Sequence, residues 1–158
     1  VRLCGDEVAV VGVNSARPNP LLWRSSGYIG AAQLGALETA LDDPRLEGRT
    51  VLIMTHYAPR LEDGTPDTRQ HGLVDADAFL RVCRAVERGA ILHGHIHRRY
   101  RVVPDGLRIP GLCAGSATKD DREGFWLLDV DARGVRATPG AWVDGGYVLE
   151  EPLSAALP

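Results

Sequence analysis

The chain has 158 residues, of which 44% are hydrophobic and 25% charged, and its net charge at pH 7 is −3. This composition indicates one globular domain that is large enough to bury a sizeable core. The acidic balance gives no reason to expect nucleic acid or an anionic membrane as a partner, and no apolar run approaches the length of a membrane span. The three cysteines form no close pair, which argues against a disulfide framework or cysteine-ligated zinc and favours a reducing cytoplasm.

The first third of the chain predicts a hairpin followed by a helix. Val1–Asp6 has the character of an edge strand and turn, and Val8–Val13 is a β-branched run typical of a buried strand. Gly30–Leu41 carries leucines at helical spacing, which predicts an amphipathic helix lying on the sheet. Asp42–Pro44 should end this helix, because the residue before a proline disfavours the helical conformation.

Two apolar runs in the middle of the chain each lead into a histidine. Thr50–Thr55 precedes His56, and the strand that begins at Ala90 precedes His95. A polar loop, Tyr57–Gly72, and then a helix lie between them. A strand–helix–strand unit joins parallel neighbours, so both histidines should leave the sheet at the carboxyl ends of its strands, where α/β sheets build ligand sites. Neighbouring strand ends are close enough for two imidazoles to reach one ion.

The connecting helix should begin with Asp75 or Asp77 as its cap and end at Gly89. Its inward stripe has helical spacing and consists of Phe79, Leu80, Cys83 and Val86.

Three of the five histidines follow one another at every second position, at His93, His95 and His97. In an extended chain His95 and His97 point the same way, and their spacing favours one imidazole on each of two ions about 3.5 to 4 Å apart. His93 should point to the other side of the strand, and we interpret it as structural.

From Tyr100 onward the pattern changes to short β segments separated by turns at 104–106, 118–123 and 131–134. The segments are Val102–Val103, Leu107–Leu112, Gly124–Val130 and Gly134–Val143. We expect an antiparallel meander that finishes the sheet, followed by a loose tail over residues 150–158. The basic run that starts at Arg98 could attract phosphate or simply lie in solvent at the end of a strand.

The histidine-bearing segments resemble a known family. Gly94–His97 after a strand, together with Thr55–Pro59 upstream, is similar to the last two motifs of the calcineurin-like metallophosphoesterases. This resemblance implies that His56 and His95 bind one metal and His97 binds another. It further implies two divalent ions, for which imidazole and carboxylate ligands accept Mn, Fe, Zn or Ni.

The resemblance covers only the latter half of that family's domain. The family's earlier motifs, Asp-x-His, a metal-bridging Gly-Asp and Gly-Asn-His-Asp/Glu, have no counterpart here, since we interpret Gly5–Asp6 as a hairpin turn. Residues 1–149 should therefore be the C-terminal portion of an α/β domain whose N-terminal half is missing, with 150–158 as a tail. The implied fold is part of a four-layer α/β/β/α sandwich, with crossover β-α-β units followed by the antiparallel meander.

The implied activity is metal-dependent hydrolysis of a phosphodiester or phosphomonoester, by an enzyme that would be inactive without its missing half. The substrate would be a small phosphoester, with a nucleotide as one candidate. The general acid belongs to an absent motif, so no catalytic residue is assigned. Candidate substrate-binding residues are Asn14 and Arg17, after the second predicted strand, and Arg69 and His71 in the long loop. Each could instead be an ordinary solvated turn or loop residue.

Two other functions stay open. The chain could be a scaffold or protein-binding module of the same fold that has lost catalysis, although matched ligand histidines argue against this. It could also be an unrelated α/β domain with a surface histidine cluster.

Overall fold

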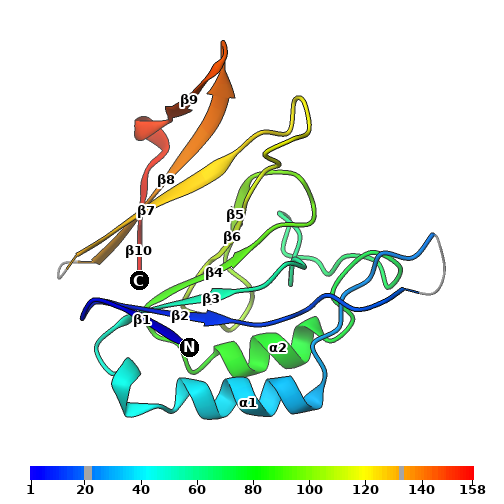
Figure 1. The fold of residues 1–158 in the computed structure, drawn as a ribbon, viewed down its shortest axis with the longest axis vertical. Helices are drawn as coiled ribbons and strands as arrows, with labels where there is room; N and C mark the ends of the chain where they lie inside the picture. The colour runs from blue at the N-terminus through cyan, green and yellow to red at the C-terminus, as the bar shows by residue number, and fades with distance from the viewer. Residues whose placement is uncertain (20–22, 132–133) are drawn as a thin grey trace.

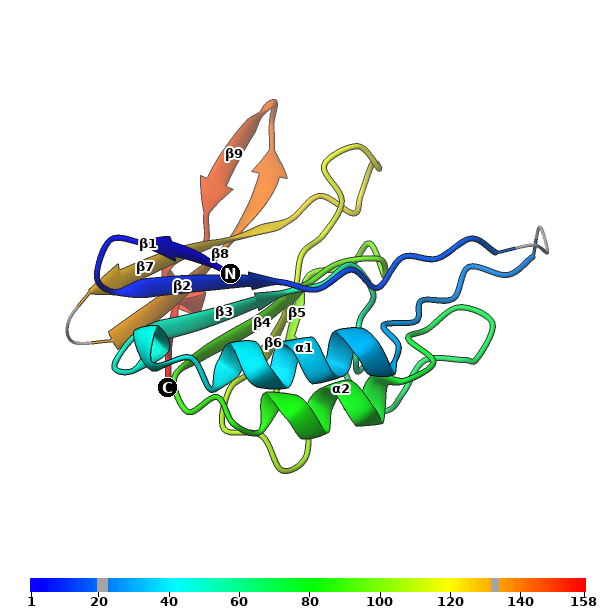
Figure 2. The same cartoon turned by 60° about the horizontal axis from the view of Figure 1, so that its bottom comes forward.

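The computed structural model describes residues 1–19, 23–131 and 134–158. These residues form an α/β fold with a mixed six-stranded sheet, a four-stranded antiparallel sheet and two helices. The helices cover one face of the six-stranded sheet, and the four-stranded sheet lies over its other face (Figures 1 and 2). Three layers of the predicted sandwich are thus present, and the described residues add no second helical layer.

The six-stranded sheet has the order β1-β2-β3-β4-β6-β5. Its members are β1 (Arg2–Cys4), β2 (Val8–Gly12), β3 (Thr50–Met54), β4 (Gly89–His93), β5 (Tyr100–Val102) and β6 (Gly111–Cys113). The four inner strands, β2, β3, β4 and β6, are parallel, whereas β1 and β5 are antiparallel edges. The predicted hairpin is confirmed, since β1 and β2 pair antiparallel across a turn at residues 5–7.

The alternation of side chains along the central strands explains why this sheet carries a layer on each face. In β3, Val51 and Ile53 pack with the helices, whereas Leu52 packs with the second sheet. Successive side chains of a strand point to opposite faces, so an unbroken apolar run is what a strand covered on both sides requires.

Both predicted helices are present. They are α1 (Ala31–Leu41) and α2 (Ala76–Cys83). Leu37 of α1 and Phe79 of α2 are buried in the core beneath the sheet. The second helix is shorter than expected: it ends at Cys83, and Gly89 is instead the first residue of β4.

The predicted position of the α2 cap is confirmed, but its capping bond is not formed. Asp75 occupies the N-cap position, but its side chain makes no capping hydrogen bond to α2. Its carboxylate instead accepts from the backbone N–H groups of Ile29 and Gly30, at the start of α1. Asp77 forms an ion pair with Arg60. Local sequence could not reveal these partners, because they come from segments far away in the chain.

The C-terminal strands do not finish the first sheet as predicted. Four strands form the second sheet: β7 (Phe125–Asp131), β8 (Gly134–Val143), β9 (Gly146–Leu149) and β10 (Ala155–Leu157). They stack on the first sheet through an apolar layer that includes Val135 and Ala137 on one side and Leu112 on the other. The meander prediction also fails at β6, which pairs parallel with β4. Residues 132–133 of the third predicted turn lie outside the described residues.

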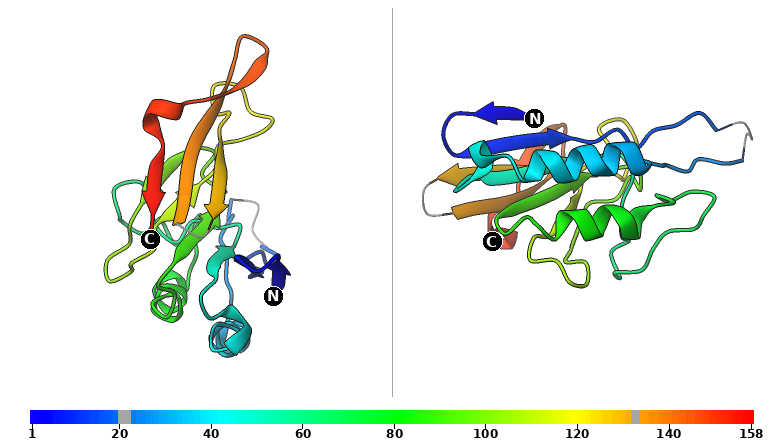
Figure 3. Two further views of the ribbon diagram at one scale, coloured as in Figure 1. Left: turned by 90° about the vertical axis from the view of Figure 1, so that its left-hand side faces the viewer. Right: turned by 90° about the horizontal axis from the view of Figure 1, so that it is seen from below.

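The last residues are not a loose tail. A 3-10 turn, Glu151–Leu153, leads into β10, which pairs antiparallel with β8 and buries Leu157. The carbonyl of Pro158 accepts from the backbone N–H of Gly89 at 3.1 Å. Figure 3 shows β10 running back toward the start of β4. No helix in the described part of the chain combines the length and apolar character that crossing a membrane would require.

Gly89 should be intolerant of a side chain. Its φ is +140°, and an added Cβ would lie 1.9 Å from the carbonyl oxygen of Val51 on β3. We expect Gly89→Ala to lower the free energy of unfolding in urea by about 3 kcal/mol or more, because strand β4 must shift away from β3. Gly35→Ala in α1 is the control, since its Cβ would meet no atom within 4 Å; it should stabilise by about 1 kcal/mol. Equal effects of the two substitutions would contradict this account.

Candidate functional site

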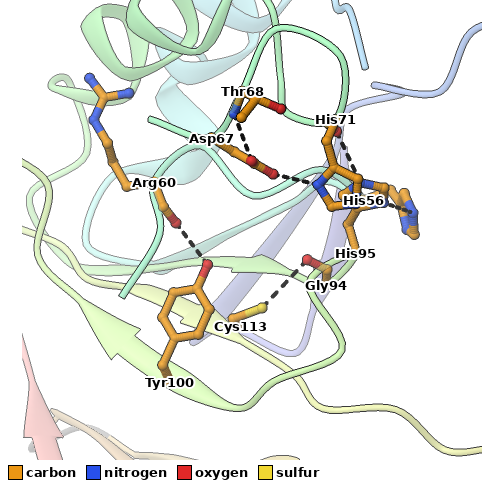
Figure 4. Close-up of polar contacts among 9 residues, drawn as sticks. All are labelled: His56, Arg60, Asp67, Thr68, His71, Gly94, His95, Tyr100 and Cys113. Carbon is orange, nitrogen blue, oxygen red and sulfur yellow. Dashed lines mark hydrogen bonds and ion pairs between the residues drawn. The ribbon is translucent and has the colours of Figure 1, made fainter. Parts of the chain in front are cut away.

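The carboxyl ends of β3 and β4 bring His56 and His95 together. The two strands pair in parallel, with Met54 opposite Leu92. Pairing continues past the strands, because the N–H of Gly94 donates to the carbonyl of His56 at 3.0 Å. The centroids of the two histidine rings then lie 5.2 Å apart. Figure 4 shows the two side chains beside one another. The prediction that both leave the sheet at one edge is confirmed.

The nitrogens of this histidine pair face each other. His95 Nδ1 lies 3.3 Å from His56 Nε2, and His95 Nε2 lies 3.0 Å from the carbonyl oxygen of His71. A carbonyl oxygen only accepts hydrogen bonds, so the proton of neutral His95 is on Nε2. The lone pair of His95 therefore lies on Nδ1 and is directed at His56.

This spacing fits two ligands of one metal ion. Two nitrogens, each about 2.0 to 2.1 Å from a tetrahedral ion, lie about 3.3 to 3.4 Å apart. Two donors do not complete a site, however. Within residues 1–19, 23–131 and 134–158, no group of three or more His, Cys, Asp or Glu side chains is placed to hold a metal ion.

His97 does not join the pair as the extended geometry requires. His95 and His97 both have positive φ values, 71° and 54°, and residues 95–98 form a bend. The expected extended backbone is therefore wrong, since the chain turns sharply after β4 to reach β5. His97 lies exposed, and its role as ligand to a second ion stays a prediction.

The environment of His95 disfavours its protonated form. Burial, and then the nearby rings of His71 and His56, lower its pKa to about 4. Its ring lies between two others, with the Tyr57 centroid at 4.1 Å and the His71 centroid at 4.2 Å. The long loop therefore positions this imidazole at two points, through its first residue, Tyr57, and through His71. The loop thus lies against the histidine pair through His71.

Ser15 positions the chain after β3, and sequence reasoning missed this role. It is 1% exposed, and its hydroxyl oxygen accepts from the backbone N–H groups of His56 and Tyr57 at 3.2 and 3.1 Å. A buried acceptor is needed here because these two N–H groups lie beyond the last strand pairing. The only local signal is a serine just after a buried strand, which is also common in ordinary turns.

The four predicted substrate-binding residues lie in different surroundings. Asn14 follows β2 at the same sheet edge, where its side chain accepts from the N–H of Ala16. Arg17 donates to the carbonyl and hydroxyl of Ser26 and lies over the Tyr28 ring. Of the loop residues, the structure brings His71 to the histidine pair, while the Arg69 side chain is exposed. Their contact with substrate stays a prediction.

A pocket of about 510 Å³ lies between the long loop and the segment that follows the histidines. Its lining residues are Leu61, Glu62, Asp63, Ile96, Arg98, Tyr100 and Arg122. Arg98 thus belongs to a concave surface near His97, which Glu62 and Asp63 also line, and attraction of phosphate there stays a prediction. Arg122 comes from the loop before β7, a distant segment that sequence reasoning did not connect with this region.

His93, in contrast, is buried in the sheet. It is 5% exposed, its ring centroid lies 5.7 Å from that of Tyr100, and neither ring nitrogen has a hydrogen-bond partner among the described residues. Burial lowers its pKa to about 4. These surroundings agree with the structural role that we interpret for it.

Comparisons with known proteins give one kind of match. No protein-family model matches the chain, and no curated protein matches it. Among solved structures, Vps29 from Entamoeba histolytica shares 15% sequence identity. Its wild-type form complexed with zinc aligns over 93% of this chain and 98% of its own with a TM-score of 0.39, and a single mutant aligns over 94% and 99% with a TM-score of 0.40. At this identity and TM-score the likeness carries neither a fold assignment nor a function.

Burial of His93 should make folding sensitive to acid. An unfolded histidine takes a proton near pH 6.5, whereas folded His93 resists protonation down to about pH 4, so stability falls as pH drops between these values. We expect the free energy of unfolding, measured in urea with chelator, to fall by about 2 kcal/mol more in the wild type than in His93→Leu between pH 7 and pH 5. His95 is present in both proteins, so its contribution to the pH dependence cancels in the comparison. An identical pH dependence would show that folded His93 is protonated as easily as unfolded histidine.

Proposed function

We propose that this chain is the histidine-bearing part of a metal-dependent phosphoester hydrolase of the calcineurin-like type. The observation that carries the proposal is the 3.3 Å approach of His56 Nε2 and His95 Nδ1 at the ends of two parallel strands. The separation and the lone-pair direction both suit a shared divalent cation. The resemblance of the two histidine motifs to that family supports the same conclusion.

The proposal divides the work between this chain and ligands from elsewhere. His56 and His95 would hold one ion, with His97 available to a second, and carboxylates would come from outside the described residues. The bound dications would polarise the phosphoester and make hydroxide available near neutral pH. This chain's own contribution is to hold the imidazoles and to offer Asn14 and the loop residues to a small phosphoester. We propose the cytoplasm as its location, which the three free cysteines support.

A second candidate is a protein-binding module that has lost catalysis. Two observations favour it. No three donors are arranged for a metal among the described residues, and the β8–β9 hairpin carries exposed apolar side chains, with Trp142 at 44% and Tyr147 at 59% exposure. Exposed aromatic side chains are common at protein interfaces.

Metal titration tests the histidine pair directly. We expect Co²⁺ to bind with a visible absorption band, and His56→Ala or His95→Ala to weaken binding by about tenfold or more, which is at least about 1.4 kcal/mol of binding free energy. His97→Ala is the matched control, and it should leave this first ion unaffected because the proposal assigns His97 to a second ion. If His56→Ala and His95→Ala bind Co²⁺ as the wild type does, the pair is not a metal site.

Hydrolysis tests the division of ligands. We expect the chain with Mn²⁺ to cleave bis(p-nitrophenyl) phosphate no faster than Mn²⁺ alone, because two imidazoles cannot complete the coordination of a hydrolytic centre. Release of p-nitrophenolate is the readout. Hydrolysis well above the Mn²⁺ control that disappears in His95→Ala would show that this chain needs no further ligands.

A further inference from the structure

One carboxylate in the long loop has surroundings unlike those of its neighbours. The side chain of Asp67 is 12% exposed, although the loop around it lies mostly in solvent. Its Oδ1 accepts from the backbone N–H of Thr68 at 2.6 Å, and its Oδ2 lies 2.5 Å from His71 Nδ1. A carboxylate accepts both bonds, so the His71 proton lies on Nδ1 and the carboxylate ties the start of this turn to its end.

The backbone closes the same turn. The carbonyl of Thr68 accepts from the N–H groups of His71 and Gly72, at 3.1 and 2.7 Å. The closure leaves no space for a side chain at position 72, where a Cβ would lie 2.7 Å from the Cβ of Asp67. Residues 67–72 therefore form a compact turn, in which Asp67 is the one side chain bonded to both ends.

This turn makes two contacts with His95. The His71 carbonyl accepts the Nε2 proton of His95 at 3.0 Å, and the His71 ring lies 4.2 Å from the His95 ring. The Tyr57 ring also contacts the His95 ring, with 4.1 Å between their centroids. The carbonyl selects the tautomer of His95, and the two rings restrict its rotation.

We propose that Asp67 is a positioning residue for His95. By holding the 67–72 turn, it keeps the His71 carbonyl on Nε2 and so keeps the lone pair of His95 on Nδ1, directed toward His56. Its consequence for metal affinity rests on the proposed function, whereas its consequence for the tautomer does not. Partners that orient a ligating histidine typically contribute about 10- to 100-fold in metal affinity.

The experiment has a metal-free arm. Long-range ¹H–¹⁵N spectra of the chelator-treated protein report which ring nitrogen of each histidine carries the proton. We expect His95 to be the Nε2–H tautomer in the wild type and a mixture of both tautomers in Asp67→Ala. Asp67→Asn should be intermediate, because an amide oxygen can accept only part of what the carboxylate accepts. Asp63→Ala is the matched control: it removes a carboxylate of the same loop that accepts from the N–H and hydroxyl of Thr65, and its spectrum should match the wild type.

The second arm measures zinc affinity by competition with a chromophoric chelator. We expect Asp67→Ala to weaken zinc binding by about tenfold and Asp63→Ala to leave it unchanged. An unchanged His95 tautomer in both Asp67 variants, with folding intact by circular dichroism, would overturn the proposal. If the wild type binds no zinc, the proposed function fails while the tautomer arm still decides the role of Asp67.

Discussion

The parallel register of β3 and β4 is the constraint on which the rest of the site depends. Met54 lies opposite Leu92, and the N–H of Gly94 donates to the carbonyl of His56. The segments that follow β3 and β4 therefore leave the sheet side by side. A slip of one residue would turn His56 or His95 to the opposite face. Gly89, at the start of β4, permits this register because it has no side chain. A Cβ at this position would clash with the carbonyl of Val51.

The elements around the histidine pair divide the task of orienting it. Ser15, in the segment after β2, accepts from the backbone N–H of His56, and the carbonyl of His71 in the 67–72 turn accepts from Nε2 of His95. Neither partner touches the nitrogens that face each other. The direction of the His95 lone pair is thus set by contacts on the Nε2 side of the ring. The nitrogens between His56 and His95 are left for a ligand.

The same geometry also limits what this chain can do by itself. Two imidazoles converge, but the bend after β4 carries His97 away from the extended line that a shared two-ion arrangement would use. Complete coordination therefore needs donors from outside the described residues. The β8–β9 hairpin also exposes Trp142 and Tyr147, the side chains that the proposed protein-binding role would use, and that role needs no metal.

The sequence by itself determined the central strands, both helices and the shared edge of His56 and His95, because apolar periodicity and the strand–helix–strand order are local properties of the chain. Only the tertiary structure decided that β6 joins in parallel, that β7 to β10 form a separate sheet, and that Asp75 binds the start of α1. It alone also revealed Ser15 and Asp67, whose partners lie on other segments or depend on how a loop closes. The polarity of a residue indicates whether its side chain will be buried. Which residues it contacts depends on packing between distant segments, and spacing along the chain does not encode that packing.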